Sequence, residues 1–149
     1  MKSIGIFCGS SAGEHPLYLE TARRVGHMLA QQGLAVVYGG GKVGLMGAVA
    51  DAALADGFIA LPGGAGTLEE IFEQWTWAQL GIHEKPCAFL NIKGYYDPLQ
   101  AMVNNMVREG FMHSRYAEML PFAASPEEII AGFRDYTPPA RKWVQQPAI

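Results

Sequence analysis

The stretch FIALPGGAGTLEE, residues 58–70, combines a strand, a turn and the start of a helix. The apolar run Phe58–Leu61 is typical of a buried strand. Thr67 is placed as a helix N-cap, and Glu70 completes a T-x-x-E capping box. The capping box needs no ligand, but the bare backbone from Pro62 to Gly66 leaves space for one. Because helix N-termini favour anions, the stretch predicts an anion site at the mouth of a helix.

Strand-like and helical segments alternate along the rest of the chain. Such alternation with short connections predicts an α/β domain with a parallel sheet and right-handed crossovers. We expect one domain over residues 1–136 and a C-terminal tail over residues 137–149. The expected strands cover residues 3–8, 34–38, 58–61 and 87–92, followed by a short apolar segment at 120–124. The expected helices cover residues 17–32, 45–55, 68–80, 99–109 and 129–134, the last with Ser125 as N-cap and Pro126 at the first helical position.

The composition is that of a globular protein of 149 residues, half of them hydrophobic, with a formal net charge of −3. This charge leaves no basic surface for a nucleic acid polymer. The sequence shows no signal peptide and no apolar run long enough for a membrane helix, so we expect no membrane partner. Cys8 and Cys87 lie in strand-like runs and are expected to be core thiols in a reducing compartment. The cytoplasm is therefore the expected location.

Three turns rich in glycine or serine are expected at one edge of the sheet, because each follows a strand. They begin at Gly9, Gly39 and Pro62. Gly39, Gly41 and Gly44 fit the dinucleotide pattern G-x-G-x-x-G, but no acidic residue follows at the spacing that a ribose requires. This turn can instead hold a phosphate on backbone N–H groups, or only allow close packing. Ser10 can likewise donate its hydroxyl to a ligand or serve as an ordinary cap.

The helix after residue 67 is rich in aromatic side chains, namely Phe72, Trp75 and Trp77. At this spacing we do not expect all three to face one core. Burial, a dimer interface and, for one ring, stacking on a base are the open alternatives. The four histidines show no spacing typical of metal ligands, so the sequence predicts no metal site, and no cofactor is expected.

Four segments together resemble the LONELY GUY family of cytokinin-activating phosphoribohydrolases. They are YGGGKVGLMG (38–47), PGGAGTLEE (62–70), WTWAQLGIHEKP (75–86) and GYYDPL (94–99). The resemblance runs from Ile4 to about Phe133, and the motif PGGxGTxxE is highly specific. It implies a Rossmann-like, doubly wound parallel sheet flanked by helices, and a homodimer. It also implies hydrolysis of the N-glycosidic bond of nucleoside 5′-monophosphates, cytokinin ribotides or AMP, to free base and ribose 5-phosphate.

The resemblance also implies roles for single residues. Glu70 matches the last glutamate of the motif and is implied to be catalytic, and Thr76 matches a further substrate-binding position. The description "possible lysine decarboxylase", also used for such sequences, has no support here, because no lysine lies in a recognisable pyridoxal site. The implied substrate-binding residues are Ser10, Gly40, Gly41, Gly44, Gly63, Gly64, Ala65, Gly66, Thr67, Leu68, Glu69 and Thr76.

The chain departs from the family at one point. Family members carry a strand, a loop and a helix with the motif Met-His-x-Arg-Lys, whereas here Ala55 is followed directly by Asp56. Either the protein is truly shortened, or a segment is missing between these residues. A true deletion would remove a central strand at a cost that a domain could hardly bear, which favours the second alternative. Without the segment, a non-catalytic nucleotide-binding protein is the alternative function.

Overall fold

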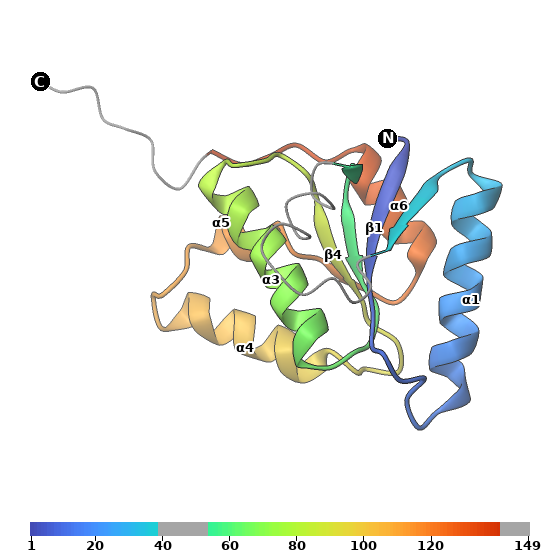
Figure 1. Ribbon diagram of the computed structural model, residues 1–149. Helices are drawn as coiled ribbons and strands as arrows, with labels where there is room; N and C mark the ends of the chain where they lie inside the picture. Colours follow the sequence, from blue (N-terminus) through green and yellow to red (C-terminus); the bar gives the residue numbers. More distant parts are fainter. Residues whose placement is uncertain (39–53, 141–149) are drawn as a thin grey trace, which may run out of the picture.

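The structure is a computed structural model that describes residues 1–38 and 54–140. Its centre is a sheet of five parallel strands in the order β2-β1-β3-β4-β5, which confirms the predicted α/β fold (Figure 1). The strands are β1 (Ser3–Phe7), β2 (Ala35–Tyr38), β3 (Phe58–Ala60), β4 (Cys87–Leu90) and β5 (Phe122–Ala123).

Helices cover both faces of the sheet, as in a doubly wound Rossmann-like domain (Figure 1). Helices α1 and α6 pack on one face, and α3, α4 and α5 pack on the other. The described helices are α1 (Pro16–Gln31), α3 (Ala65–Leu80), α4 (Asp97–Arg108), α5 (Ser114–Glu118) and α6 (Pro126–Arg134).

The side chains of β1 alternate between the two faces, as the period of a strand requires. Ile4 and Ile6 belong to the core that α1 and α6 cover. Phe7 belongs to the core on the α3 side, where its ring stacks on Phe58 with the centroids 5.8 Å apart. Two separate apolar layers therefore hold the sheet, and β1 contributes to both.

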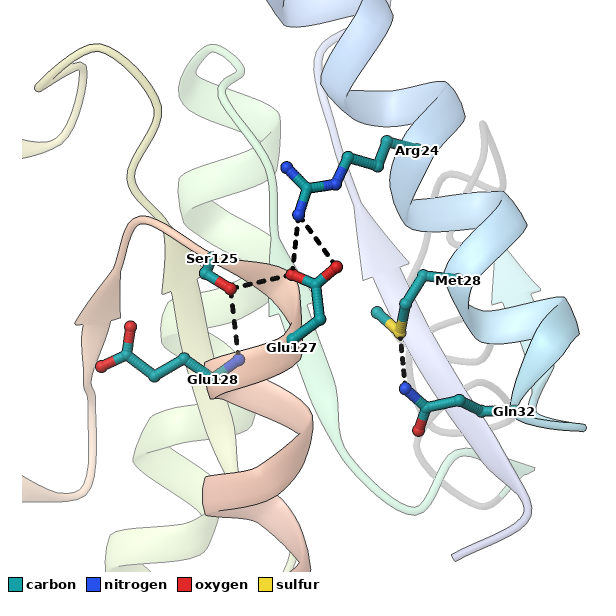
Figure 2. Close-up of polar contacts among 6 residues, drawn as sticks. All are labelled: Arg24, Met28, Gln32, Ser125, Glu127 and Glu128. Atoms are coloured by element: carbon teal, nitrogen blue, oxygen red, sulfur yellow. Dashed lines mark hydrogen bonds and ion pairs between the residues drawn. The ribbon is translucent and has the colours of Figure 1, made fainter.

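A polar network ties α1 to α6 (Figure 2). The Arg24 guanidinium donates to both carboxylate oxygens of Glu127 at 2.9 and 3.0 Å, and the Ser125 hydroxyl donates to the same carboxylate at 2.8 Å. The Ser125 hydroxyl also accepts from the backbone N–H of Glu128 at 3.4 Å, which confirms the predicted N-cap. Because Arg24 and Glu127 are both exposed, the network orients α6 more than it stabilises the fold.

Most predicted elements are present, with ends shifted by a few residues. The predicted helix at 68–80 begins three residues earlier, at Ala65, and the prediction did not include α5 at all. The helix predicted at 45–55 lies outside the described residues except for its last two. Residues 137–140 hold no helix or strand, and the rest of the predicted tail is outside the described part.

The aromatic residues of α3 correct one expectation. Trp75 is buried, and its indole N–H donates to the backbone carbonyl of Tyr116 at 3.0 Å. Phe72 and Trp77 are partly buried and pack against the same core as Trp75. The expectation that the three rings cannot share one core is therefore wrong. Helix α3 packs on the sheet and also contacts α5 through Trp75, so it buries a broad arc of its surface.

The sheet is continuous across the described residues, since β1 pairs with both β2 and β3. The junction at Ala55 and Asp56 fits into this sheet, because Ala55 is buried and the Asp56 N–H donates to the Ser3 carbonyl at 3.0 Å. A further strand could join only at an outer edge. At the β2 edge, Val36 and Tyr38 are 48% and 64% exposed. The strand that the family resemblance adds would thus lie at the rim of this sheet, not at its centre.

Among residues 1–38 and 54–140, no helix combines the length and the apolar character needed to cross a membrane.

Candidate functional site

The candidate site lies where the turns after β1 and β3 meet. The Gly9 N–H donates to the Pro62 carbonyl at 3.2 Å, and the Leu61 N–H donates to the Phe7 carbonyl at 2.8 Å. The chain turns to opposite sides of the sheet after β1 and after β3, so this is the topological switch point where α/β sheets bind ligands. Two of the three predicted turns therefore do share one edge. The third, which holds Gly40, Gly41 and Gly44, lies outside the described residues.

Helix α3 begins without a side-chain cap. Its N-cap is Gly64, in extended backbone, and the Leu68 N–H donates to the Gly64 carbonyl at 3.2 Å. Thr67 lies inside the first turn and is 4% exposed. The predicted capping box of Thr67 and Glu70 is therefore wrong. The local sequence favours Thr67 as a cap, but in the folded protein its side chain is buried against Gly63 and does not cap the helix.

Gly63 must be glycine because of what surrounds it. A Cβ at this position would lie 2.2 Å from the Thr67 hydroxyl oxygen and 2.7 Å from the Gly9 nitrogen. The Thr67 side chain and the Gly9 backbone therefore both pack directly against Gly63 and leave no room for a side chain there. Gly64 and Gly66 differ, because a Cβ on either would meet no atom within 4 Å. The backbone from Gly64 to Gly66 is thus open to a ligand.

The start of α3 suits an anion. The first N–H groups of a helix, here those of Ala65, Gly66 and Thr67, have no acceptor four residues earlier in the same helix. The helix dipole adds partial positive charge at this end. Ala65 and Gly66 are exposed, as is Glu69, whereas Leu68 is only partly exposed. Within the predicted binding stretch from Gly63 to Glu69, the exposed residues are thus Gly64, Ala65, Gly66 and Glu69, whereas Thr67 is buried and Leu68 packs against the core.

Glu70 is half-buried in the second turn of α3. Burial raises the pKa of the Cys8 thiol, and the negative charge of Glu70 adds to the rise, whereas a hydrogen bond with Tyr38 opposes it. Cys8 follows β1, so the charge of Glu70 acts at the carboxyl end of that strand. The carboxylate and the open backbone of Gly64–Gly66 therefore belong to the same helix end.

Thr76 is exposed on α3. Six residues separate it from Glu70, which corresponds to about 9 Å along the helix axis and to a different helix face. Thr76 thus lies on another part of α3 than the glycine turn, and its predicted role in substrate binding stays a prediction.

A cavity of about 540 Å³ opens beside the glycine turns. It is lined by residues of both turns, among them Ser10 after β1 and Gly63 after β3. Tyr18 of α1 and Tyr95 also line it, and their ring centroids are 5.9 Å apart in an edge-on arrangement. Ser10 is thus brought together with Gly63. Glu70 is not part of the cavity lining.

Two tyrosines that the sequence did not single out hold the turn after β3. The Tyr95 hydroxyl donates to the Gly63 carbonyl at 2.5 Å, and the Tyr96 hydroxyl donates to the Leu61 carbonyl at 2.6 Å. Burial raises the pKa of Tyr96, and a hydrogen bond from the Gly63 backbone partly offsets this rise. The segment GYYDPL carries both tyrosines, but nothing in its spacing points to a turn some thirty residues earlier.

In the described part of the chain, no three His, Cys, Asp or Glu side chains gather closely enough to hold a metal ion. Both cysteines have free thiols, and burial raises the pKa of Cys87.

The chain is similar to proteins of known family. Residues 49–133 match the family described as "Possible lysine decarboxylase". The chain is 38% identical to the cytokinin riboside 5′-monophosphate phosphoribohydrolase LOG7 of Arabidopsis thaliana, over 92% of this chain and 83% of that protein. It is 34% identical to LOGL2 of Oryza sativa subsp. japonica, a probable enzyme of the same name, over 97% of this chain and 77% of that protein.

The relatives are longer within the aligned region. The alignment with the rice protein spans 188 positions, whereas 97% of this chain is about 145 residues, so about 43 positions have no residue here. The alignment with the Arabidopsis protein leaves the same number, since it spans 180 positions and 92% of this chain is about 137 residues. The identity and the coverage nevertheless extend over most of both chains. The chain belongs to the LONELY GUY (LOG) family of cytokinin riboside 5′-monophosphate phosphoribohydrolases.

Proposed function

We propose that the protein is a hydrolase that cleaves the N-glycosidic bond of cytokinin riboside 5′-monophosphates and releases the base and ribose 5-phosphate. The position of Glu70 carries this proposal. It lies on the helix whose open glycine backbone suits a phosphate, and its charge acts on Cys8 at the carboxyl end of β1. The names of the similar plant proteins give the same substrate class.

The proposed chemistry uses two parts of the site, the Glu70 carboxylate and the backbone N–H groups at the start of α3. Cleavage of an N-glycosidic bond passes through a state with positive charge on the ribose. The Glu70 carboxylate stabilises that charge and can orient or deprotonate the attacking water. The open N–H groups at the start of α3 bind the 5′-phosphate, and this remote binding energy positions the sugar against the carboxylate. A carboxylate near an anion site is thus useful, because the two groups meet different parts of one ribotide.

The proposal also covers a second substrate, the oligomeric state and the location of the protein. AMP is a second substrate, and the active form is a cytoplasmic homodimer. The substrate-binding residues remain as predicted from the family motif, with Thr76 the one whose position gives the least support, because it lies apart from the turns.

The test replaces Glu70 with glutamine and measures release of free base from N6-isopentenyladenosine 5′-monophosphate and from AMP. We expect Glu70→Gln to lose base release by at least about 100-fold, the usual effect of removing a catalytic acid or base. Glu73→Gln, one turn further along α3, is the matched control and is expected to keep the wild-type rate. Thermal melting of both variants must show a folded protein. A Glu70→Gln variant with most of the wild-type activity would disprove the assignment.

A second function, nucleotide binding without catalysis, is favoured by the 43 aligned positions of the relatives that have no residue here. The family resemblance places a motif with arginine and lysine in such a segment. The intact mass of the protein distinguishes the two functions. A mass well above 16.2 kDa, with peptide mapping that places the additional residues between Ala55 and Asp56, supports the enzyme, whereas 16.2 kDa with no base release supports the binder.

A further inference from the structure

The loop that follows β4 is held rigidly in the described structure. The Asn91 side chain accepts from the Tyr96 N–H and donates to the Asp97 carboxylate, both at 2.8 Å. Lys93 and Gly94 have positive φ angles of 55° and 67°. The loop therefore has one well-defined backbone path, and it presents the two tyrosine hydroxyls to the turn after β3.

The two tyrosines hold different peptide groups of that turn. Tyr95 donates to the Gly63 carbonyl, and Tyr96 donates to the Leu61 carbonyl. The described peptide bonds are all trans, so the carbonyl of one residue and the N–H of the next point in opposite directions. Holding the Gly63 carbonyl thus also sets the direction of the Gly64 N–H. The hydrogen bond to the Leu61 carbonyl fixes the direction of no N–H group, because the next residue, Pro62, has no N–H.

The Gly64 N–H therefore points away from Tyr95. Gly64 is exposed, and a Cβ built on it would meet no atom within 4 Å. The Tyr96 hydroxyl, in contrast, donates to the Leu61 carbonyl. Of the two glycines, Gly64 is the one whose N–H direction is set by the Tyr95 hydrogen bond, and it lines the cavity beside the start of α3 together with Tyr95.

We propose that Tyr95 is a positioning residue for the ligand phosphate, because its hydroxyl fixes the Gly63–Gly64 peptide so that the Gly64 N–H adds to the donors at the start of α3. This inference rests on the proposed function only for the identity of the phosphate ligand. Tyr95 acts before binding, by removing the freedom of one peptide group.

The first test measures binding of ribose 5-phosphate by titration calorimetry to the full chain and to Tyr95→Phe. We expect about tenfold weaker binding in the variant, since one charge-assisted hydrogen bond to phosphate loses its preorganised donor. With AMP as substrate, KM should rise by about the same factor while kcat changes by less than about twofold, because the remaining donors at the start of α3 still position the bound sugar and the one weakened contact acts equally in the ground and transition states. A merely structural loss of stability would lower the active fraction, and thus kcat, without raising KM.

Tyr96→Phe is the matched control, since it removes a hydroxyl that holds the same turn but orients no open donor. Tyr96 is 2% exposed, so its variant should melt at a lower temperature than Tyr95→Phe. Its affinity for ribose 5-phosphate should stay within about twofold of wild type. Equal losses of affinity in both variants, or no loss in Tyr95→Phe, would overturn the proposal.

The outcome is separable from that of the proposed function. If the wild-type protein binds ribose 5-phosphate but releases no base from AMP, the catalytic proposal fails, while the comparison of the two tyrosine variants still decides the role of Tyr95. If the wild-type protein binds neither AMP nor ribose 5-phosphate, both proposals fail.

Discussion

The Asp56 carboxylate accepts a hydrogen bond from the backbone N–H of Lys2 at 2.5 Å, and a second one from Ser3 at 3.0 Å. The residue that follows the junction at Ala55 is thereby fastened to the start of the first strand. These backbone hydrogen bonds hold the pKa of Asp56 below its ordinary value of 3.8. The bonds thus favour the ionised carboxylate in the folded protein.

Asp56→Asn should lower the free energy of unfolding at pH 7 by about 1 kcal/mol or less, because the carboxylate is largely exposed. Since the folded pKa is lower than the unfolded one, this stabilisation is present above pH 3.8 and disappears as the pH falls through the folded value. Urea unfolding at pH 7 and pH 3 measures the effect. The exposed Asp135→Asn is the control, and a pH-independent difference between Asp56→Asn and wild type would contradict the explanation.

The glycines of the turn after β3 should differ in their tolerance of alanine. Gly63→Ala places a Cβ against the Thr67 hydroxyl and the Gly9 nitrogen, so it should destabilise the fold by about 1–3 kcal/mol. Gly66→Ala meets open space in a helix and should keep or raise the melting temperature, by up to about 1 kcal/mol of stability. Its methyl group should nevertheless weaken binding of ribose 5-phosphate. Gly66→Ala with both wild-type stability and wild-type affinity would show that no ligand approaches this backbone.

Trp75 should stabilise the protein through its indole N–H as well as through its burial. Trp75→Phe leaves the buried Tyr116 carbonyl without this donor, and it should lower the free energy of unfolding by about 1–3 kcal/mol in a denaturant titration. Trp77→Phe, on the same helix but only partly buried, is the control and should cost clearly less. Equal costs would mean that apolar contact alone explains the stability that Trp75 provides.

His83 should make the fold less stable in mild acid. Burial, with the nearby charge of Lys85, lowers its pKa from 6.5 to about 4. Because the unfolded chain binds the proton first, the wild-type protein should lose stability between pH 6.5 and about pH 4, by about 1–2 kcal/mol once its partial exposure is considered.

His83→Asn should remove this pH dependence, since asparagine does not titrate and its carbonyl can still accept from the Lys85 N–H, as the imidazole does at 3.1 Å. The measurement is the difference in unfolding free energy between variant and wild type at pH 7 and pH 4.5. The difference should shift in favour of the variant as the pH falls. His27→Asn, at an exposed position of α1, is the control variant.

Local sequence signals predicted most of the described fold. The strand β1 and the helices α1 and α6 follow from apolar periodicity and from caps, and the Ser125 cap is confirmed in detail. These signals are local, because a strand or helix buries one face whatever lies across from it. The family motif, being contiguous, also pointed to the stretch from Gly63 to Glu70 without any knowledge of the fold.

The tertiary structure decided what those residues do. It placed Thr67 beneath Gly63 instead of at the helix cap, and it started α3 at Ala65. It also brought Tyr95 to the Gly63 carbonyl, across a separation of 32 residues. No local pattern encodes such a contact, because the partner is a backbone carbonyl that every residue carries. The sequence by itself therefore determined the order of strands and helices and pointed to the stretch that holds the candidate site, while packing between distant segments determined how the backbone of that stretch is held.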